Sequence, residues 1–87
     1  MAKLIKLVKR FLGEPSEVRF DDVRSLLKAF GFEEVRSSGS HHIFRNPQGQ
    51  MEIIPKSGGK MVKSTYVKKI VRLLNLEDWY AENKDRE

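Results

Sequence analysis

The sequence predicts an α+β domain in which helices cover one face of a three-stranded antiparallel sheet. Three separate segments space their apolar residues as amphipathic helices do. Between the second and the third of these segments lie three short strand-like segments joined by turn residues. A chain of 87 residues has the length of one domain, so residues 1–87 are expected to share a single core.

The first helical segment is amphipathic and basic. Its apolar face consists of Leu4, Ile5, Val8, Phe11 and Leu12. The other face carries basic residues and no acid, and Gly13 and Pro15 are expected to end the helix. Such a helix can lie on a membrane surface, but three turns favour packing against the domain with the basic face in water. We therefore expect residues 1–13 to form an additional N-terminal helix.

The second helical segment, residues 22–30, has a clear start and stop. Asp21 is expected to cap its N-terminus, because a short acidic side chain accepts a hydrogen bond from a free backbone N–H. Gly31 follows at the position where a left-handed residue ends many helices, and Phe32 is then placed to fold back on Leu27. These residues are expected to build the core and to carry no function.

Three short strands should follow one another as an antiparallel meander. They are residues 34–37, 41–46 and 51–54. A glycine loop at residues 57–60 then leads into the last helical segment, at about residues 65–74. Residues 77–87 form a polar, acidic tail that includes Trp79 and Tyr80. These two aromatic residues fit an anchor to the core or to a second subunit, and the sequence leaves both open.

Without its first helix, this order is α-β-β-β-α, the layout of a double-stranded-RNA-binding domain. In that architecture, the loop after the third strand and the start of the last helix bring basic residues to phosphates. The residues at those positions here are Lys56, Lys60, Lys63, Lys68 and Lys69. Topology alone is a weak guide to function.

The charge distribution favours a polyanionic partner. The formal net charge is +5, and residues 53–76 contain only basic residues among their charged side chains. Solvated basic helix faces are the simpler explanation. The chain has no cysteine, which excludes disulfides and thiolate metal sites, and no apolar run of the length of a membrane span. No secretory leader is recognisable, so the cytoplasm is the expected location.

Both histidines lie at the start of the second predicted strand, in the segment Gly39-Ser40-His41-His42. Neighbouring residues of a strand point to opposite faces, so His41 shares a face with Ile43 and His42 shares one with Phe44. If Phe44 is the core residue, His41 lies on the open face; if Ile43 is, the two histidines exchange places. The apolar pattern leaves both arrangements open.

A histidine beside basic residues suffices in principle to cleave RNA. RNA carries its own nucleophile, the 2′-OH, and needs a base for that proton and cations for the charge that develops on the phosphate. Two histidines without a third ligand make a poor zinc site, so we expect neither a metal nor another cofactor. A surface histidine that only forms hydrogen bonds is the structural alternative.

The ordered motifs resemble the HicA toxin family, the mRNA interferases of toxin–antitoxin pairs, over about residues 18–76. The most specific parts are a helix that ends in Gly31-Phe32, the segment Gly39-Ser40-His41-His42, and later Gly58-Gly59-Lys60. The resemblance implies a double-stranded-RNA-binding-like fold, RNA cleavage and neutralisation by a HicB antitoxin. It places the catalytic histidine at His41, with His42 as second choice.

This sequence departs from the family pattern at one place. Many members have a further histidine between the proline that ends the third strand and the glycine loop, where this chain has Lys56-Ser57. If that histidine assists catalysis, the reaction is slower here, or its protonating role falls to Lys56, Lys60 or water.

The leading hypothesis is a metal-independent endoribonuclease. His41 acts as base or acid with His42 as its substitute, and Arg45 and Lys60 stabilise the phosphate. The lysines expected to hold the RNA backbone are Lys56, Lys63, Lys68 and Lys69. The alternative hypothesis is an RNA-binding module without catalysis. A third hypothesis is a toxin subunit whose basic face is covered by its antitoxin. A homodimer and a toxin–antitoxin hetero-oligomer both stay open.

Overall fold

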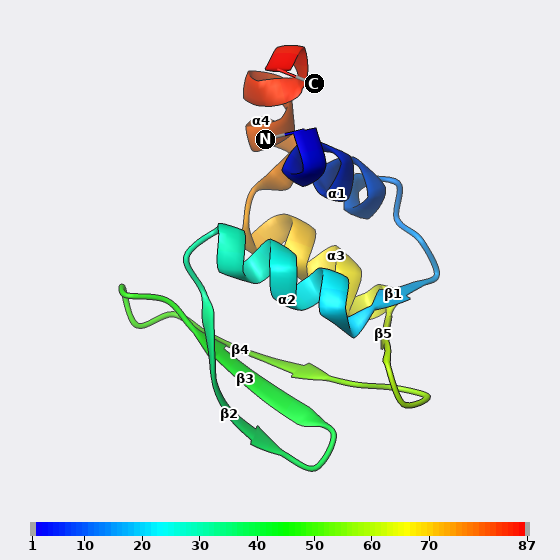
Figure 1. The fold of residues 1–87 in the computed structure, drawn as a ribbon, viewed down its shortest axis with the longest axis vertical. Coiled ribbons are helices and arrows are strands. Elements are labelled where there is room, and N and C mark those ends of the chain that lie inside the picture. The colour runs from blue at the N-terminus through cyan, green and yellow to red at the C-terminus, as the bar shows by residue number, and fades with distance from the viewer. Residues whose placement is uncertain (1, 87) are drawn as a thin grey trace.

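The computed structural model describes residues 2–86, which form three layers (Figure 1). A curved three-stranded sheet forms the first layer, and two helices, α2 (Phe20–Ala29) and α3 (Ser64–Leu73), cover one of its faces. Helices α1 (Ala2–Leu12) and α4 (Leu76–Asn83) lie on the side of α2 and α3 that faces away from the sheet. The predicted α+β class and the additional N-terminal helix are therefore confirmed.

The main sheet has the predicted meander topology, with the order β2-β3-β4 and antiparallel pairing throughout. Its strands are β2 (Glu33–Ser38), β3 (His41–Arg45) and β4 (Met51–Pro55). The pairing of β2 with β3 shifts between Glu34 and Arg36, so a bulge interrupts the alternation along β2. The other face of the sheet is not covered by any described helix (Figure 1).

A second, two-stranded sheet was not predicted. Strand β1 (Glu17–Arg19) pairs antiparallel with β5 (Met61–Lys63), with Val18 opposite Val62. Both valines are fully buried. Each strand is only three residues long, which is too short to show an alternating pattern, and the partner lies more than forty positions away in the chain. This ladder joins the start of α2 to the start of α3.

The end of α2 follows the prediction, whereas its start does not. Gly31 has a φ of 91°, its N–H bonds to the Lys28 carbonyl at 3.1 Å, and the Phe32 N–H bonds to the Leu27 carbonyl at 2.9 Å. This is the Schellman ending that the sequence predicts. The predicted cap Asp21 is wrong, because α2 begins at Phe20, two residues before its predicted start at residue 22, and no side chain caps it. The β1 ladder, rather than a cap, fixes this start.

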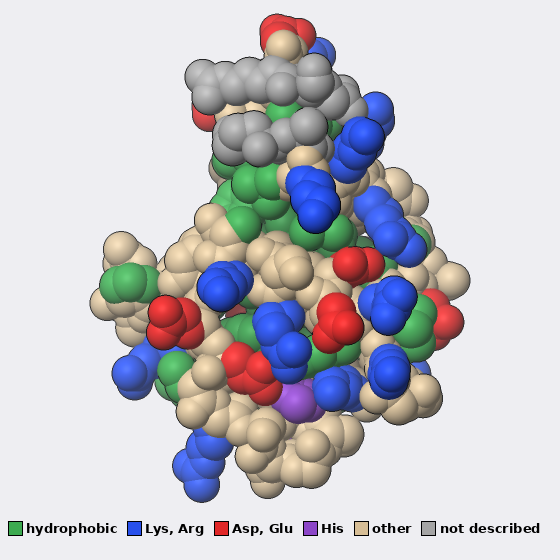
Figure 2. Space-filling view, in the orientation of Figure 1, with side chains coloured by type: hydrophobic (Ala, Val, Ile, Leu, Met, Phe, Trp, Pro, Cys, Tyr) green, Lys and Arg blue, Asp and Glu red, His purple; other side chains and the backbone are tan. Residues whose placement is uncertain are grey.

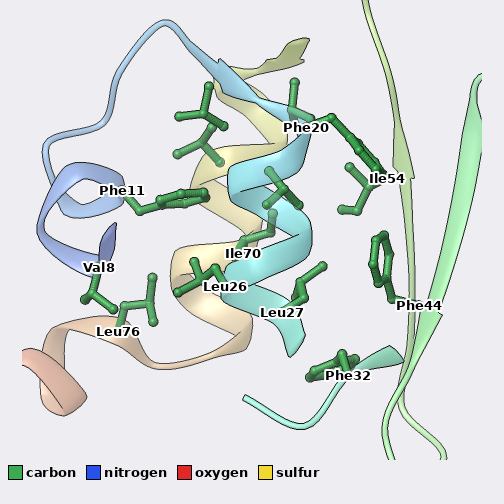
Figure 3. Close-up of a cluster of buried hydrophobic side chains, with 14 residues drawn as sticks. Val8, Phe11, Phe20, Leu26, Leu27, Phe32, Phe44, Ile54, Ile70 and Leu76 are labelled. Carbon is green, nitrogen blue, oxygen red and sulfur yellow. The ribbon is translucent and has the colours of Figure 1, made fainter. Parts of the chain in front are cut away.

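The core runs through all three layers (Figure 3). Phe44 and Ile54 project from the sheet onto α2, and both are almost completely buried. On the other side of α2 and α3, Phe11 of α1 and Leu76 of α4 are fully buried. Burial of one large apolar side chain contributes about 1.5–3 kcal/mol, so α1 and α4 are integral to the domain.

The predicted tail, as far as residue 86, is mostly helical and contacts the rest of the chain. Residues 76–83 form α4, and a short 3-10 turn (Lys84–Arg86) follows. The Trp79 ring packs edge-on against Phe30 with the centroids 5.6 Å apart. Of the two anchors left open by the sequence, the contact seen is with the core. Within residues 2–86, no helix is both long and apolar enough to traverse a membrane.

Candidate functional site

The two histidines of β3 lie on opposite faces of the sheet. Phe44 is 1% exposed and faces the helices, so His42, two residues earlier, faces them too and is 8% exposed. His41 is exposed on the open face. This arrangement is the first of the two that the sequence leaves open.

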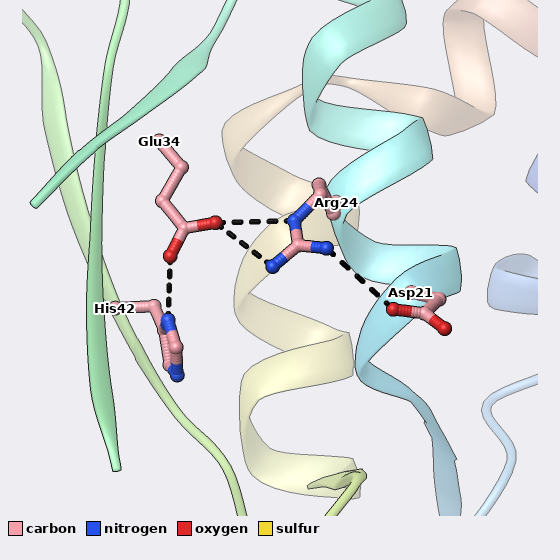
Figure 4. A network of polar contacts seen from close by, with 4 residues as sticks. All are labelled: Asp21, Arg24, Glu34 and His42. Atoms are coloured by element: carbon pink, nitrogen blue, oxygen red, sulfur yellow. Dashed lines mark hydrogen bonds and ion pairs between the residues drawn. The ribbon is translucent and has the colours of Figure 1, made fainter. Parts of the chain in front are cut away.

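His42 is held by a network of side chains that the sequence analysis missed (Figure 4). Its Nδ1 lies 2.6 Å from Oε2 of Glu34. The other carboxylate oxygen of Glu34 accepts a hydrogen bond from Nε of Arg24 at 3.1 Å and forms an ion pair with Nη2 of Arg24 at 3.0 Å. Arg24 also lies 3.7 Å from Asp21. Glu34 stands opposite Phe44 in the β2–β3 register, one diagonal step from His42. Because the bulge in β2 changes the register, the spacing of residues in the sequence does not predict that Glu34 and His42 are neighbours.

The environment of Glu34 favours its carboxylate form. Burial raises the pKa of Glu34, but the hydrogen bonds from His42 and Arg24 and the charge of Arg24 outweigh it, so the pKa lies below its ordinary value of 4.5. Glu34 is therefore an anion at neutral pH and fixes the orientation of the His42 ring through Nδ1. A carboxylate that orients an imidazole in this way recurs in catalytic sites and in structural networks alike.

Phe20 provides the surface on which this cluster packs. The His42 ring lies 4.4 Å from the Phe20 ring, centroid to centroid. Arg24 and the Lys56 ammonium lie 4.9 and 4.7 Å from the same centroid, as cation–π contacts. Figure 2 shows a histidine on this side of the molecule, among basic and acidic side chains. Lys56 is thus brought to the histidine-bearing end of β3.

His41 has a different neighbourhood. Its cross-strand partners are Ser38 of β2 and Pro55 of β4. Arg45, at the other end of β3, shares the open face, but three residues lie between it and His41, so the two Cα atoms are about 13 Å apart. The backbone therefore does not bring Arg45 next to His41, and the role of Arg45 stays a prediction. The open face also carries apolar side chains. Ile53 of β4, which stands opposite Ile43, is 49% exposed.

The predicted RNA-binding lysines are spread over three places. Lys56 and Lys60 flank the glycine loop, and the Lys60 carbonyl accepts a hydrogen bond from the Phe20 N–H at 2.7 Å. Lys63 ends β5. Lys68 and Lys69 lie on the outside of α3, where the Lys69 ammonium lies 3.0 Å from Oε1 of Glu52. The structure thus places Lys56 close to the histidines and the lysines of α3 farther along the surface.

The described residues form no cluster of metal ligands. Within residues 2–86, no three or more His, Cys, Asp or Glu side chains gather so that they could hold a metal ion.

The three-stranded sheet, the two helices on one of its faces and the order α-β-β-β-α define a double-stranded-RNA-binding-like domain. Residues 20–76 match the family model described as the HicA toxin of bacterial toxin–antitoxin systems. The chain therefore belongs to the HicA toxin family, as its motifs predict, and is a toxin of a toxin–antitoxin system. No curated protein and no solved structure matched the chain. The family match leaves out α1, β1 and nearly all of α4.

Proposed function

We propose that this toxin is an endoribonuclease that cleaves mRNA in the cytoplasm without a metal ion, with a histidine of β3 as general base and acid. The observation that carries the proposal is an exposed imidazole, His41, directly after Gly39-Ser40 in a chain that belongs to the HicA family. Lys56 lies at the same end of the sheet and offers a cation for the phosphate.

The reaction needs no group beyond those of the RNA and the protein. His41 takes the proton of a 2′-OH, and that oxygen attacks the adjacent phosphorus. The bond from phosphorus to the 5′-oxygen breaks, and the leaving oxygen takes a proton from an acid, which is His41 in its protonated form, Lys56, Lys60 or water. The products are a 2′,3′-cyclic phosphate and a 5′-OH. Cations beside the phosphate stabilise the charge that grows in the transition state.

The other residues have supporting roles. Lys60 stabilises the phosphate, and Arg45 contacts the RNA farther along the open face. The lysines that bind the backbone are Lys56, Lys63, Lys68 and Lys69. Such contacts position RNA without reading its bases. His42 is the alternative base, although its contact with Glu34 and its burial favour a structural role.

The test is cleavage of a long single-stranded RNA in the presence of a chelator by wild type, His41→Ala and His42→Gln. We expect wild type to release 2′,3′-cyclic phosphate ends and His41→Ala to lose the activity. His42→Gln keeps a polar partner for Glu34 and should keep activity if folding is intact by circular dichroism. Full activity of His41→Ala would falsify the assignment, and loss only in His42→Gln would move the base to the helix-covered face.

A second candidate function is an RNA-binding module without catalysis. It is favoured by Lys56-Ser57, which stands where many family members have a further histidine. This candidate predicts salt-dependent RNA binding by wild type without any cleavage product.

We further propose that a HicB-type antitoxin neutralises the toxin. Addition of the purified antitoxin to the cleavage assay should abolish product formation at an equimolar ratio. Unchanged cleavage at excess antitoxin would contradict this partner.

A further inference from the structure

A cleft of about 300 Å³ lies between the end of β4, the end of β5 and the first turns of α3. The residues that line it are Pro55, Lys56, Ser57, Lys63 and Tyr66. It therefore combines two ammonium groups and two hydroxyl groups, and its lining contains no carboxylate. Phosphate oxygens accept hydrogen bonds from both kinds of group, and the two positive charges match a phosphodiester anion.

Two residues that line the cleft are paired with the backbone at the start of β3. Pro55, which lines it, stands directly opposite His41 in the β3–β4 ladder, so their Cα atoms are about 5 Å apart. The Lys56 N–H donates a hydrogen bond to the carbonyl of Ser40, the residue before His41, at 2.7 Å. The cleft therefore borders the backbone at the start of β3, the strand that carries His41.

The Lys56 ammonium and the backbone of Ser57 and Lys63 are held by contacts within the protein. The Lys56 ammonium rests on the Phe20 ring at 4.7 Å from its centroid. Ser57 and Met61 exchange backbone hydrogen bonds of 2.6 and 2.9 Å, which close the glycine loop. Lys63 is fixed by the β1–β5 ladder, opposite Glu17. Such preorganisation lowers the entropy cost of binding.

We infer that this cleft binds the RNA phosphate next to the scissile one. Lys63 and the Tyr66 hydroxyl bind that neighbouring phosphate and take no part in the cleavage step. This inference rests on the proposed ribonuclease function. Its consequence is a minimum substrate: a dinucleotide with one phosphate leaves the cleft empty, whereas a trinucleotide with two phosphates fills it. Tyr66 and Ser57 thereby gain a role that neither charge nor motif assigned to them.

The first experiment compares cleavage of a dinucleotide with that of a trinucleotide by wild type, Lys63→Ala, Tyr66→Phe and the control Lys28→Ala. Lys28 is an exposed lysine of α2 that does not line the cleft. We expect Lys63→Ala to lower kcat/KM for the trinucleotide about tenfold, mainly through KM, and to leave the dinucleotide unchanged. Tyr66→Phe should do the same to a smaller extent, and Lys28→Ala should change neither substrate.

The second experiment measures binding without cleavage. A trinucleotide with 2′-O-methyl groups cannot react, and its affinity is followed by fluorescence anisotropy at several salt concentrations. Loss of one phosphate contact in single-stranded RNA should lower the salt slope by about 0.7 in Lys63→Ala, and by nothing in Lys28→Ala.

The outcomes separate the two proposals. Equal effects of Lys63→Ala on both substrates, or none on either, overturn the cleft as a phosphate site while the ribonuclease stands. If wild type cleaves nothing but Lys63→Ala still loses affinity and salt slope, the ribonuclease fails and a phosphate site in the cleft is supported.

Discussion

Replacement of Glu34 by Ala should destabilise the domain strongly for a single change on a strand. The change removes the 2.6 Å contact with His42 and leaves that buried ring without its carboxylate partner. A hydrogen bond to a charged group contributes about 1.5–3 kcal/mol. The ion pair with Arg24, whose side chain is 47% exposed, adds only about 0.2–1 kcal/mol. The free energy of unfolding should therefore fall by about 2–3 kcal/mol.

Thermal unfolding followed by circular dichroism tests this magnitude. For a domain of this length, about 2–3 kcal/mol corresponds to a decrease of about 10–20 °C in Tm at neutral pH. The matched control is Glu33→Ala, the neighbouring carboxylate, which is exposed and stands opposite Arg45. It should change the free energy of unfolding by no more than about 0.5 kcal/mol.

The pH dependence gives a second check on the same contact. The pKa of Glu34 in the folded chain lies below 4.5, so its stabilisation is fully present above pH 4.5 and is lost as the pH falls through the folded value. The difference in Tm between wild type and Glu34→Ala should therefore be constant near neutrality and shrink below pH 4.5. A decrease of less than about 2 °C at pH 7, or a difference that grows as the pH falls below 4.5, would refute the reasoning.

Three further changes test other parts of the structure. His41→Ala should lower the rate of RNA cleavage at least about 100-fold with no change in Tm, since the side chain is exposed; a rate within threefold of wild type would contradict its role. Gly31→Ala should cost about 1–2 kcal/mol in urea unfolding, because φ is 91° there although a Cβ would meet no atom within 4 Å; an unchanged midpoint would show that the turn relaxes. Phe11→Ala should cost about 3–5 kcal/mol, and a loss below 1 kcal/mol would mean that α1 is not part of the cooperative unit.

Much of the fold could be predicted because its signals are local. The apolar stripe of α1, the Gly31 ending of α2 and the turns between the strands each act over a few residues. The β1–β5 ladder could not be predicted, since it joins distant three-residue segments whose stability depends on burial of Val18 and Val62. The start of α2 was misplaced for the same reason.

The candidate site could be predicted only in part. The motif pointed to both histidines, and alternation along β3 correctly separated their faces. Which face is covered depended on whether Phe44 or Ile43 enters the core, which the helices decide. Glu34 and Arg24 escaped notice because they come from β2 and α2 and meet His42 only after the sheet and the helix pack together.

The outer layer formed by α1 and α4 covers apolar residues of the family-matched segment, so we expect that this segment does not fold stably by itself. Residues 20–76 excised alone would lack Phe11, Val8 and most of α4. The sides of α2 and α3 that these residues cover would become a contiguous water-facing apolar area, which favours aggregation. Chimeras and minimal toxins should therefore keep α1 and α4 together with the family-matched segment. The same holds when a segment of the candidate site is exchanged.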